Sequence, residues 1–392
     1  MTNSAPDTSD FAIGKTFPAS GATRERLHIG THRRAQKNNS ADMAFGIYSY
    51  ERSASGEPFR ATGLTETLQP GWIAVHPGGN NLYAVNEVRT MGDHKGGAVT
   101  AFAIDPDNGK LTPLNSAPLP PMPCHCAVDA SGRFLLVATF GGGSLHLFAL
   151  QADGRIGVEL DLHVHRGSSA HPVRQTGPHA HAAVIDPGNG FILVPDLGID
   201  RLLVYRLDHD HGRLIPLPER TVALPPLSGP RHLAFAPSAR HAYLINEMSA
   251  TISVFAWDGA TGTLDLLQSV DLLPVGFEGL RSGAAIAVHP DGRHLYATTR
   301  SHGSSGMPPK PGLDRLVWFD VDPATGCLSP GGSLDPGGGI PRDFAIAPSG
   351  NFLYVGLQRS GRIVEYALDN GIPSATGRTM ETPVPVCLTF AP

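Results

Sequence analysis

Short apolar runs alternate with tight turns along almost the whole chain. One phrase recurs, in which a small or polar lead-in precedes an apolar run, a Pro or Gly turn and a second apolar run. Four clear copies read GWIAVHPGGNNLYAVNE from Gly71, RHLAFAPSARHAYLINE from Arg231, AAIAVHPDGRHLYATTR from Ala284 and RDFAIAPSGNFLYVGLQ from Arg342. Two looser copies begin at Cys124 and His181. Paired runs of this length around a turn are typical of β-hairpins, so the pattern predicts a repeat array of strands.

The spacing of the copies predicts how the hairpins are arranged. Their turns lie 50 to 58 residues apart, and further strand-like runs such as SLHLFALQADGRI and RLLVYRLDHDHGRL lie between them. Each unit therefore supplies about four strands, which is the content of one propeller blade. Six copies are complete, while RLHIGTH near the start and PVPVCLTFAP at the end resemble the two halves of a seventh.

We therefore predict an all-β fold, a seven-bladed β-propeller over residues 26–392 whose ring is closed by an N-terminal strand that completes the C-terminal blade. A closed ring leaves no open sheet edge, whereas a solenoid would not need matching half-repeats at its ends. Residues 1–25 are predicted to be a flexible N-terminal lead-in outside the propeller.

Composition agrees with this interpretation and narrows the class of protein. The chain has 46 Gly and 35 Pro with only 17% charged residues, as expected for many short strands and turns. Its net charge of −5 argues against nucleic acid or an anionic membrane as a partner, and no apolar run is long enough to span a membrane. The four cysteines form no CxxC pair and the start does not resemble a signal peptide, so a cytoplasmic location is expected.

Aligning the copies on their turns makes equivalent positions comparable and locates a candidate site. Six residues before the turn stand Gly71, Cys124, His181, Arg231, Ala284, Arg342 and Val386, and ten residues after it stand Glu87, Phe140, Leu197, Glu247, Arg300, Gln358 and His32. Positions that served only the scaffold would be apolar or interchangeable, yet many of these are charged and differ between blades. We expect them to form a polar, asymmetric mouth of the channel. For Glu87 and Arg342, ion pairing across blades is an equally good explanation.

Three phrases resemble the seven-bladed propeller lactonase family, which contains bacterial 6-phosphogluconolactonases and the fungal carboxy-cis,cis-muconate cyclase. They are GPHAHAAVIDPGNGFILVPDLGIDRLLVYRL, GPRHLAFAPSARHAYLINEMSATISVF and HPDGRHLYATTR, and the resemblance extends over roughly residues 26–390. It implies a catalytic set of His181, Arg231, Glu247 and Arg300. The chain departs from the family pattern at Ala285, where a Glu is common, at TTR in place of SNR, and in a long following loop, SHGSSGMPPKPGLD.

The resemblance implies a hydrolase that opens a sugar δ-lactone by acid–base catalysis. His181 would move the proton, since imidazole is mostly neutral at cytoplasmic pH. Glu247 would orient it or act as the base itself, with a pKa raised by loss of water. Arg231 and Arg300 would stabilise the oxyanion or bind an anionic group.

A second set is predicted to bind the substrate: His179, Asp196, Asn246, Arg342, Gln358, Glu87 and His32. No cofactor is expected and catalysis is predicted to be metal-independent, because the pairs His163/His165, His179/His181 and His209/His211 lack an evident third ligand. Two other functions remain open. One is a lactonising cycloisomerase acting on a carboxymuconate-type diacid, and the other is a non-catalytic propeller that serves as a binding platform. The expected partner is a small lactone, a sugar acid derivative of carbohydrate metabolism, and the protein is expected to be a monomer or homodimer.

Overall fold

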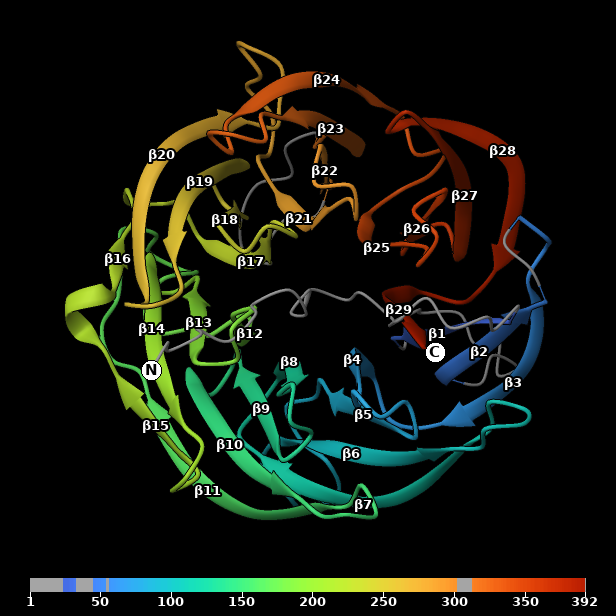
Figure 1. The fold of residues 1–392 in the computed structure, drawn as a ribbon, viewed down its shortest axis with the longest axis vertical. Helices are drawn as coiled ribbons and strands as arrows, with labels where there is room; N and C mark the ends of the chain where they lie inside the picture. The colour runs from blue at the N-terminus through green and yellow to red at the C-terminus, as the bar shows by residue number, and fades with distance from the viewer. Residues whose placement is uncertain (1–23, 33–44, 54–55, 302–311, 392) are drawn as a thin grey trace, which may run out of the picture.

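The strands form a ring of seven sheets around a central channel (Figure 1). The computed structural model describes residues 24–32, 45–53, 56–301 and 312–391. Within these residues it has 29 strands and one short 3-10 helix, Pro218–Arg220. The described part of the chain holds no helix long and apolar enough to cross a membrane. The predicted seven-bladed propeller is confirmed.

Each sheet is one blade of antiparallel strands, which follow one another in the chain in all blades but blade 7, and the strand named first in each blade lies innermost in the ring (Figure 1). Blade 1 contains β4 (Pro70–Val75), β5 (Asn81–Asn86), β6 (Gly97–Ile104) and β7 (Leu111–Leu119). Blade 2 contains β8 (Pro123–Val128), β9 (Phe134–Thr139), β10 (Ser144–Leu150) and β11 (Ile156–Val164). Blade 3 contains β12 (Val184–Ile185), β13 (Phe191–Asp196), β14 (Arg201–Asp208) and β15 (Arg213–Pro216), with β16 (Val222–Ala223) also paired to β14.

The remaining blades follow the same plan. Blade 4 contains β17 (Pro230–Phe235), β18 (His241–Asn246), β19 (Thr251–Asp258) and β20 (Thr263–Asp271). Blade 5 contains β21 (Gly283–Val288), β22 (His294–Thr299), β23 (Arg315–Val321) and β24 (Leu328–Leu334). Blade 6 contains β25 (Pro341–Ile346), β26 (Phe352–Leu357), β27 (Arg362–Asp369) and β28 (Ile372–Glu381).

Blade 7 is built from both ends of the described chain. Its strand order is β29 (Pro385–Ala391), β1 (Glu25–Thr31), β2 (Gly46–Arg52) and β3 (Arg60–Glu66). β1 pairs antiparallel with β29, from Arg26 opposite Ala391 to Thr31 opposite Pro385. The predicted closure is therefore confirmed: one blade joins the two ends of the described chain, and only short, protected strand edges remain.

The core lies between neighbouring blades. Successive side chains of a strand point to opposite faces of the sheet, so each blade offers an apolar surface to the blade on either side. Leu136 and Leu145 of blade 2 pack with Ile192 and Val194 of blade 3 in one such cluster, and all four are fully buried. The apolar residues that alternate along each strand therefore form the contacts between neighbouring sheets.

Two sequence predictions fall mainly outside the described residues. The predicted lead-in, 1–25, lies there except for Arg24 and Glu25, and β1 begins at Glu25. Of the long loop after Arg300, residues 302–311 also lie outside the described part.

Candidate functional site

Irregularities in the innermost hairpins turn particular side chains toward the channel. In blades 1, 2, 4 and 6 the pairing of the first two strands shifts by one residue, as between Pro230 and His232 in blade 4. The residues skipped by these shifts are Gly71, Cys124, Arg231 and Arg342. They occupy the position six residues before the turn. A bulge bends a strand and re-aims a side chain, which explains why this position carries site residues instead of core residues.

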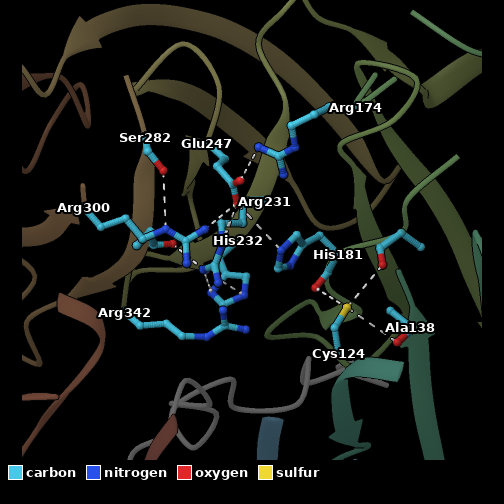
Figure 2. Close-up of polar contacts among 12 residues, drawn as sticks. Cys124, Ala138, Arg174, His181, Arg231, His232, Glu247, Ser282, Arg300 and Arg342 are labelled. Carbon is cyan, nitrogen blue, oxygen red and sulfur yellow. Dashed lines mark hydrogen bonds and ion pairs between the residues drawn. The ribbon is translucent and has the colours of Figure 1, made fainter. Parts of the chain in front are cut away.

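Three arginines from different parts of the ring converge on the carboxylate of Glu247 (Figure 2). Arg300 Nη2 donates to Oε2 at 2.8 Å, Arg231 Nε lies 3.2 Å from the same oxygen, and Arg174 Nη1 lies 2.7 Å from Oε1. Glu247, Arg231 and Arg300 are each at most 3% exposed. This buried cluster contains three of the four residues predicted to be catalytic.

The charge state of Glu247 differs from the expectation. Burial alone would raise the pKa of this carboxyl, but the charges of Arg174, Arg300 and Arg231 outweigh burial and hold the pKa well below 4.5. The predicted raised pKa is therefore wrong, because the sequence did not show how many cations surround this side chain. Glu247 is a fixed negative charge and a poor proton acceptor at neutral pH.

His181 lies beside this cluster and is the titratable group best suited to accept a proton. Its Nε2 is 3.9 Å from Glu247 Oε2, and its buried Nδ1 has no hydrogen-bond partner. Burial first, and then the charge of Arg231, lowers the pKa of His181 well below 6.5. The imidazole is consequently neutral at pH 7, with a nitrogen available to a ligand.

Unpartnered donors surround the same position. Arg300 Nη1 is buried without a hydrogen-bond partner, and Arg231 Nε makes its ion pair with Glu247 but no hydrogen bond. Arg231 Nη1 donates to the carbonyl of Ala284, which fixes the guanidinium across to blade 5. Burial lowers the pKa of Arg300 to about 9, so it remains charged at neutral pH. Buried polar groups normally have partners, so the free N–H of Arg300 marks a place for an oxygen-rich ligand.

Four residues of this region lie outside the predicted catalytic and substrate-binding sets. Arg174 comes from the long loop that leads into GPHAH, a position at the rim of the site, but its sequence context does not show that Glu247 is its partner. His232 packs edge-on against His181 with ring centroids 5.3 Å apart, and Trp72 stacks on His125 at 4.5 Å. A signal for His232 and His125 did exist, since each directly follows a bulge residue, Arg231 or Cys124.

A second polar group lies on the blade 1 side of the mouth. Arg342 Nη2 donates to Glu87 Oε2 at 3.3 Å, and His32 Nε2 lies 3.4 Å from the same oxygen. The Arg342–Glu87 pair joins blade 6 to blade 1, which is the ion pairing across blades that was the alternative explanation for these two residues. Gly71 belongs to the arrangement, because a Cβ at this position would stand 2.3 Å from Glu87 Oε2.

An open cavity adjoins Glu87 and His32. Its volume is about 510 Å³, and it is lined by His32, Leu68, Gln69, Glu87, Val88, Arg89, Thr90 and Met122. The cavity thus lies beside the Arg342–Glu87 pair and not beside Glu247. Counting both groups, four arginines face two glutamates, so the mouth carries an excess of positive charge.

The other predicted binding residues lie further back. Asp196 is fully buried, where its Oδ1 accepts the N–H of His179 at 2.7 Å and its Oδ2 contacts His165 Nδ1 at 2.6 Å. His179 itself stacks on Phe140 and its Nδ1 donates to the carbonyl of that residue. Asn246 donates to Thr251 and Ser253 within blade 4.

These contacts give Asp196, His179 and Asn246 a supporting place around the site. Asp196 in particular fixes the loop two residues before His181. Gln358 follows β26 and is partly buried, with its backbone N–H bonded to Ile340.

The remaining sequence candidates show no sign of nucleophile or metal chemistry. Burial raises the pKa of the Cys124 thiol, and its Sγ points to the carbonyls of Ala180 and His181. His163 and His209 are bonded to the carbonyls of Leu214 and Asn189. None of the three predicted histidine pairs belongs to a group of three or more metal-ligating side chains in the described part of the chain.

Comparison with known proteins gives consistent matches over nearly the whole chain. The family model for the seven-bladed β-propeller lactonases matches residues 26–390. A 6-phosphogluconolactonase of Bacillus subtilis is 32% identical over 356 residues, which cover 88% of this chain and 94% of that protein. The 6-phosphogluconolactonase of Serratia proteamaculans is 32% identical over 331 residues, covering 82% and 88%. The solved structure of the Pseudomonas aeruginosa periplasmic gluconolactonase superposes with a TM-score of 0.84 at 30% identity, covering 94% of this chain and 99% of that one.

Proposed function

Because the chain belongs to the seven-bladed β-propeller lactonase family, we propose that it hydrolyses a sugar δ-lactone of the 6-phosphogluconolactone type. The observation that carries the proposal is the neutral His181, whose Nδ1 has no hydrogen-bond partner and whose ring lies beside the buried cluster of Arg231, Arg300 and Glu247. A base without a proton beside fixed cationic donors is the combination that lactone opening requires.

The proposed reaction uses His181 as base and then as acid. A water molecule attacks the lactone carbonyl while the imidazole accepts one of its protons. Arg300 and Arg231 donate hydrogen bonds to the oxyanion that forms on the carbonyl oxygen. The intermediate then expels the ring oxygen, the C–O bond breaks, and the imidazolium returns the proton to this alkoxide. The product is an open hydroxy acid, which loses its proton to solvent at neutral pH.

Glu247 holds the arginines in this mechanism and does not carry the proton. Its low pKa keeps it charged, and its oxygens orient Arg174, Arg231 and Arg300 toward one another. We propose that the reaction needs no metal, because the carboxylate nearest His181 is already surrounded by cations. A divalent ion placed there would meet strong repulsion.

Charge also suggests which lactone is bound. Four arginines against two glutamates leave an excess of positive charge that suits a substrate with a dianionic phosphate. The cavity beside Glu87 and Arg89 has room for this end of the substrate, and Arg342 pairs with Glu87 at its wall. Arg342, Gln358 and His32 are then the substrate-binding residues of the open side.

A panel of aldonolactones, phosphorylated and not, followed by acid release at constant pH, tests the proposal. We expect 6-phosphogluconolactone to be opened fastest, and His181→Ala and Arg231→Ala to abolish the acceleration. His146→Asn is the matched control, since His146 is buried in blade 2 and bonded to Ser144 and Glu159. An absence of acceleration over buffer for every lactone would refute the proposal. Loss of diene absorbance from a carboxymuconate would favour the cycloisomerase instead.

We further propose a cytoplasmic location. All four cysteines are free thiols, which suits a reducing compartment. Since one structural relative is periplasmic, fractionation of the native cell with a tagged chain is the direct test.

A further inference from the structure

The turn between β21 and β22 in blade 5 brings three metal-ligating side chains together far from the mouth. His289 Nδ1 lies 2.9 Å from Asp291 Oδ1, and His294 Nδ1 lies 2.9 Å from Asp291 Oδ2. In the described part of the chain this is the one group of three such residues whose ligand atoms all lie within 4.8 Å of one another. β22 separates His294 from Arg300 by about 20 Å at the usual rise of a strand, so the turn is remote from the proposed site.

Hydrogen bonding determines which nitrogen of His289 carries the proton. Its Nε2 lies 2.7 Å from the carbonyl oxygen of Gly350, and a carbonyl only accepts, so Nε2 is the N–H. In neutral imidazole Nδ1 is then a bare lone pair. It accepts the N–H of Asp291 at 3.2 Å and at the same time faces the carboxylate oxygen of that residue. Two acceptors at 2.9 Å repel each other unless a proton or a metal cation lies between them.

His294 lies on the other side of the carboxylate, where its Nδ1 faces Asp291 Oδ2. A histidine that binds a metal usually gives its second nitrogen to a carboxylate or a backbone carbonyl, which fixes the tautomer and the ring. His289 has such a partner in Gly350, whereas Asp320 Oδ1 lies 3.9 Å from His294 Nε2, beyond hydrogen-bond distance.

Other blades carry a histidine at one of these turn positions, but they do not carry the two histidines and the aspartate together. His76 occupies the position of His289 in blade 1, where its Nε2 likewise contacts the carbonyl of Gly132 at 3.1 Å. The acidic residue is absent there, because Gly78 stands in the place of Asp291. His241 occupies the position of His294 in blade 4, again without the acid. Among the described blades, blade 5 alone carries all three.

We propose that His289, Asp291 and His294 bind one divalent transition-metal ion of the Zn²⁺ class. Two imidazole nitrogens and a carboxylate oxygen supply three ligands, and water completes the shell because Asp291 is exposed. Through Gly350, in the turn between β25 and β26, the ion would tie blade 5 to blade 6. The site is independent of lactone hydrolysis.

Titration calorimetry with ZnCl₂ at pH 7.5, on EDTA-treated protein without a histidine tag, tests the site. We expect one equivalent of Zn²⁺ to bind, and Asp291→Asn and His294→Asn each to lose it or weaken it more than tenfold. His211→Asn is the matched control, because His211 makes an exposed pair with Asp208 without a third ligand. Zn²⁺ should also raise the Tm of the wild-type protein by a few degrees and that of Asp291→Asn by less.

Two results would overturn the proposal. One is no binding of Zn²⁺ by the wild-type protein, and the other is unchanged stoichiometry and affinity in both variants. Circular dichroism checks that each variant is folded.

Discussion

Two buried clusters of arginine and glutamate lie in different parts of the ring and differ in how their charges are matched. In the Glu247 cluster, three arginines meet one carboxylate and donors are left unpartnered. In the second cluster, Arg52 of blade 7 lies at most 2% exposed against blade 6. It pairs with Glu25 and Glu365, and Arg378 pairs with Glu365 as well.

Aromatic rings complete the Arg52 cluster. The guanidinium of Arg52 lies 4.7 Å from the ring centroid of Phe59, 5.1 Å from that of Phe352 and 5.6 Å from that of Tyr354. Two arginines thus face two glutamates, and rings cover the cation. The balanced charges of the Arg52 cluster hold blade 7 against blade 6. The excess positive charge of the Glu247 cluster instead favours binding of an anion. Matched charge therefore indicates structure, and unmatched buried charge indicates a ligand.

Removing a donor from the mouth should produce the largest effect on activity. In Arg300→Gln we expect kcat/KM for the lactone to fall about 10²–10³-fold, because the oxyanion loses a fixed cationic donor. Steady-state kinetics measure the loss, and thermal unfolding checks the fold. The control is Arg378→Gln in the Arg52 cluster, which should leave kcat/KM unchanged. Equal activity losses in the two variants would break the distinction between the clusters.

The Arg52 cluster should respond in stability instead. In Arg52→Met we expect the free energy of unfolding to fall by about 3 kcal/mol, because Glu25 and Glu365 lose their buried partner. Urea unfolding measures this change, and kcat/KM at low temperature should stay at the wild-type value. In the control Arg60→Met, whose side chain is 77% exposed, the loss should be under about 1 kcal/mol. If Arg52→Met were as stable as wild type, the Arg52 cluster would not be what holds blade 7 against blade 6.

Removing a residue that supports the site from behind should have a smaller effect on activity. In Asp196→Asn we expect kcat to fall about tenfold with little change in KM, since the N–H of His179 loses a charged acceptor and His181 is less well positioned. The pH profile should keep its shape, because Asp196 carries no proton in the reaction. Asp161→Asn, in blade 2 and bonded to Leu214, is the control that should retain full kcat. A changed pH profile would contradict a positioning role.

Acid should leave the activity almost unchanged over the first pH units below neutrality and should lower the stability. The lowered pKa of His181 predicts that kcat/KM stays level as pH falls below 6.5, with its acid limb well below that value. Burial also lowers the pKa of His28 and His32 to about 4. Between pH 6.5 and 4 the unfolded chain therefore binds protons that the folded chain does not, so stability falls as pH falls. We expect each of these two histidines to account for a loss of about 2 kcal/mol by pH 5 in urea unfolding. Stability that rose toward pH 5 would contradict these shifts.

The sequence predicted the ring and the closure because both follow from local patterns. Apolar runs at fixed spacing specify strands, and half-repeats at the two ends specify their pairing. The same alignment placed His181, Arg231, Glu247 and Arg300 at two equivalent positions of the repeat. It also placed Asp196 and Asn246 among the substrate contacts, although both side chains are turned into the sheet behind the mouth. Position along a strand does not tell which way a side chain at its end is turned.

The sequence by itself determined that this chain forms seven four-stranded units and which positions of each unit face the mouth. Only the tertiary structure decided the chemistry of those positions. Arg174 reaches Glu247 from a loop with no repeat pattern, and the three arginines then lower the pKa that burial would have raised. Strand periodicity is a local property, whereas a pKa depends on every charge within a few ångströms, and folding brings those charges from distant blades.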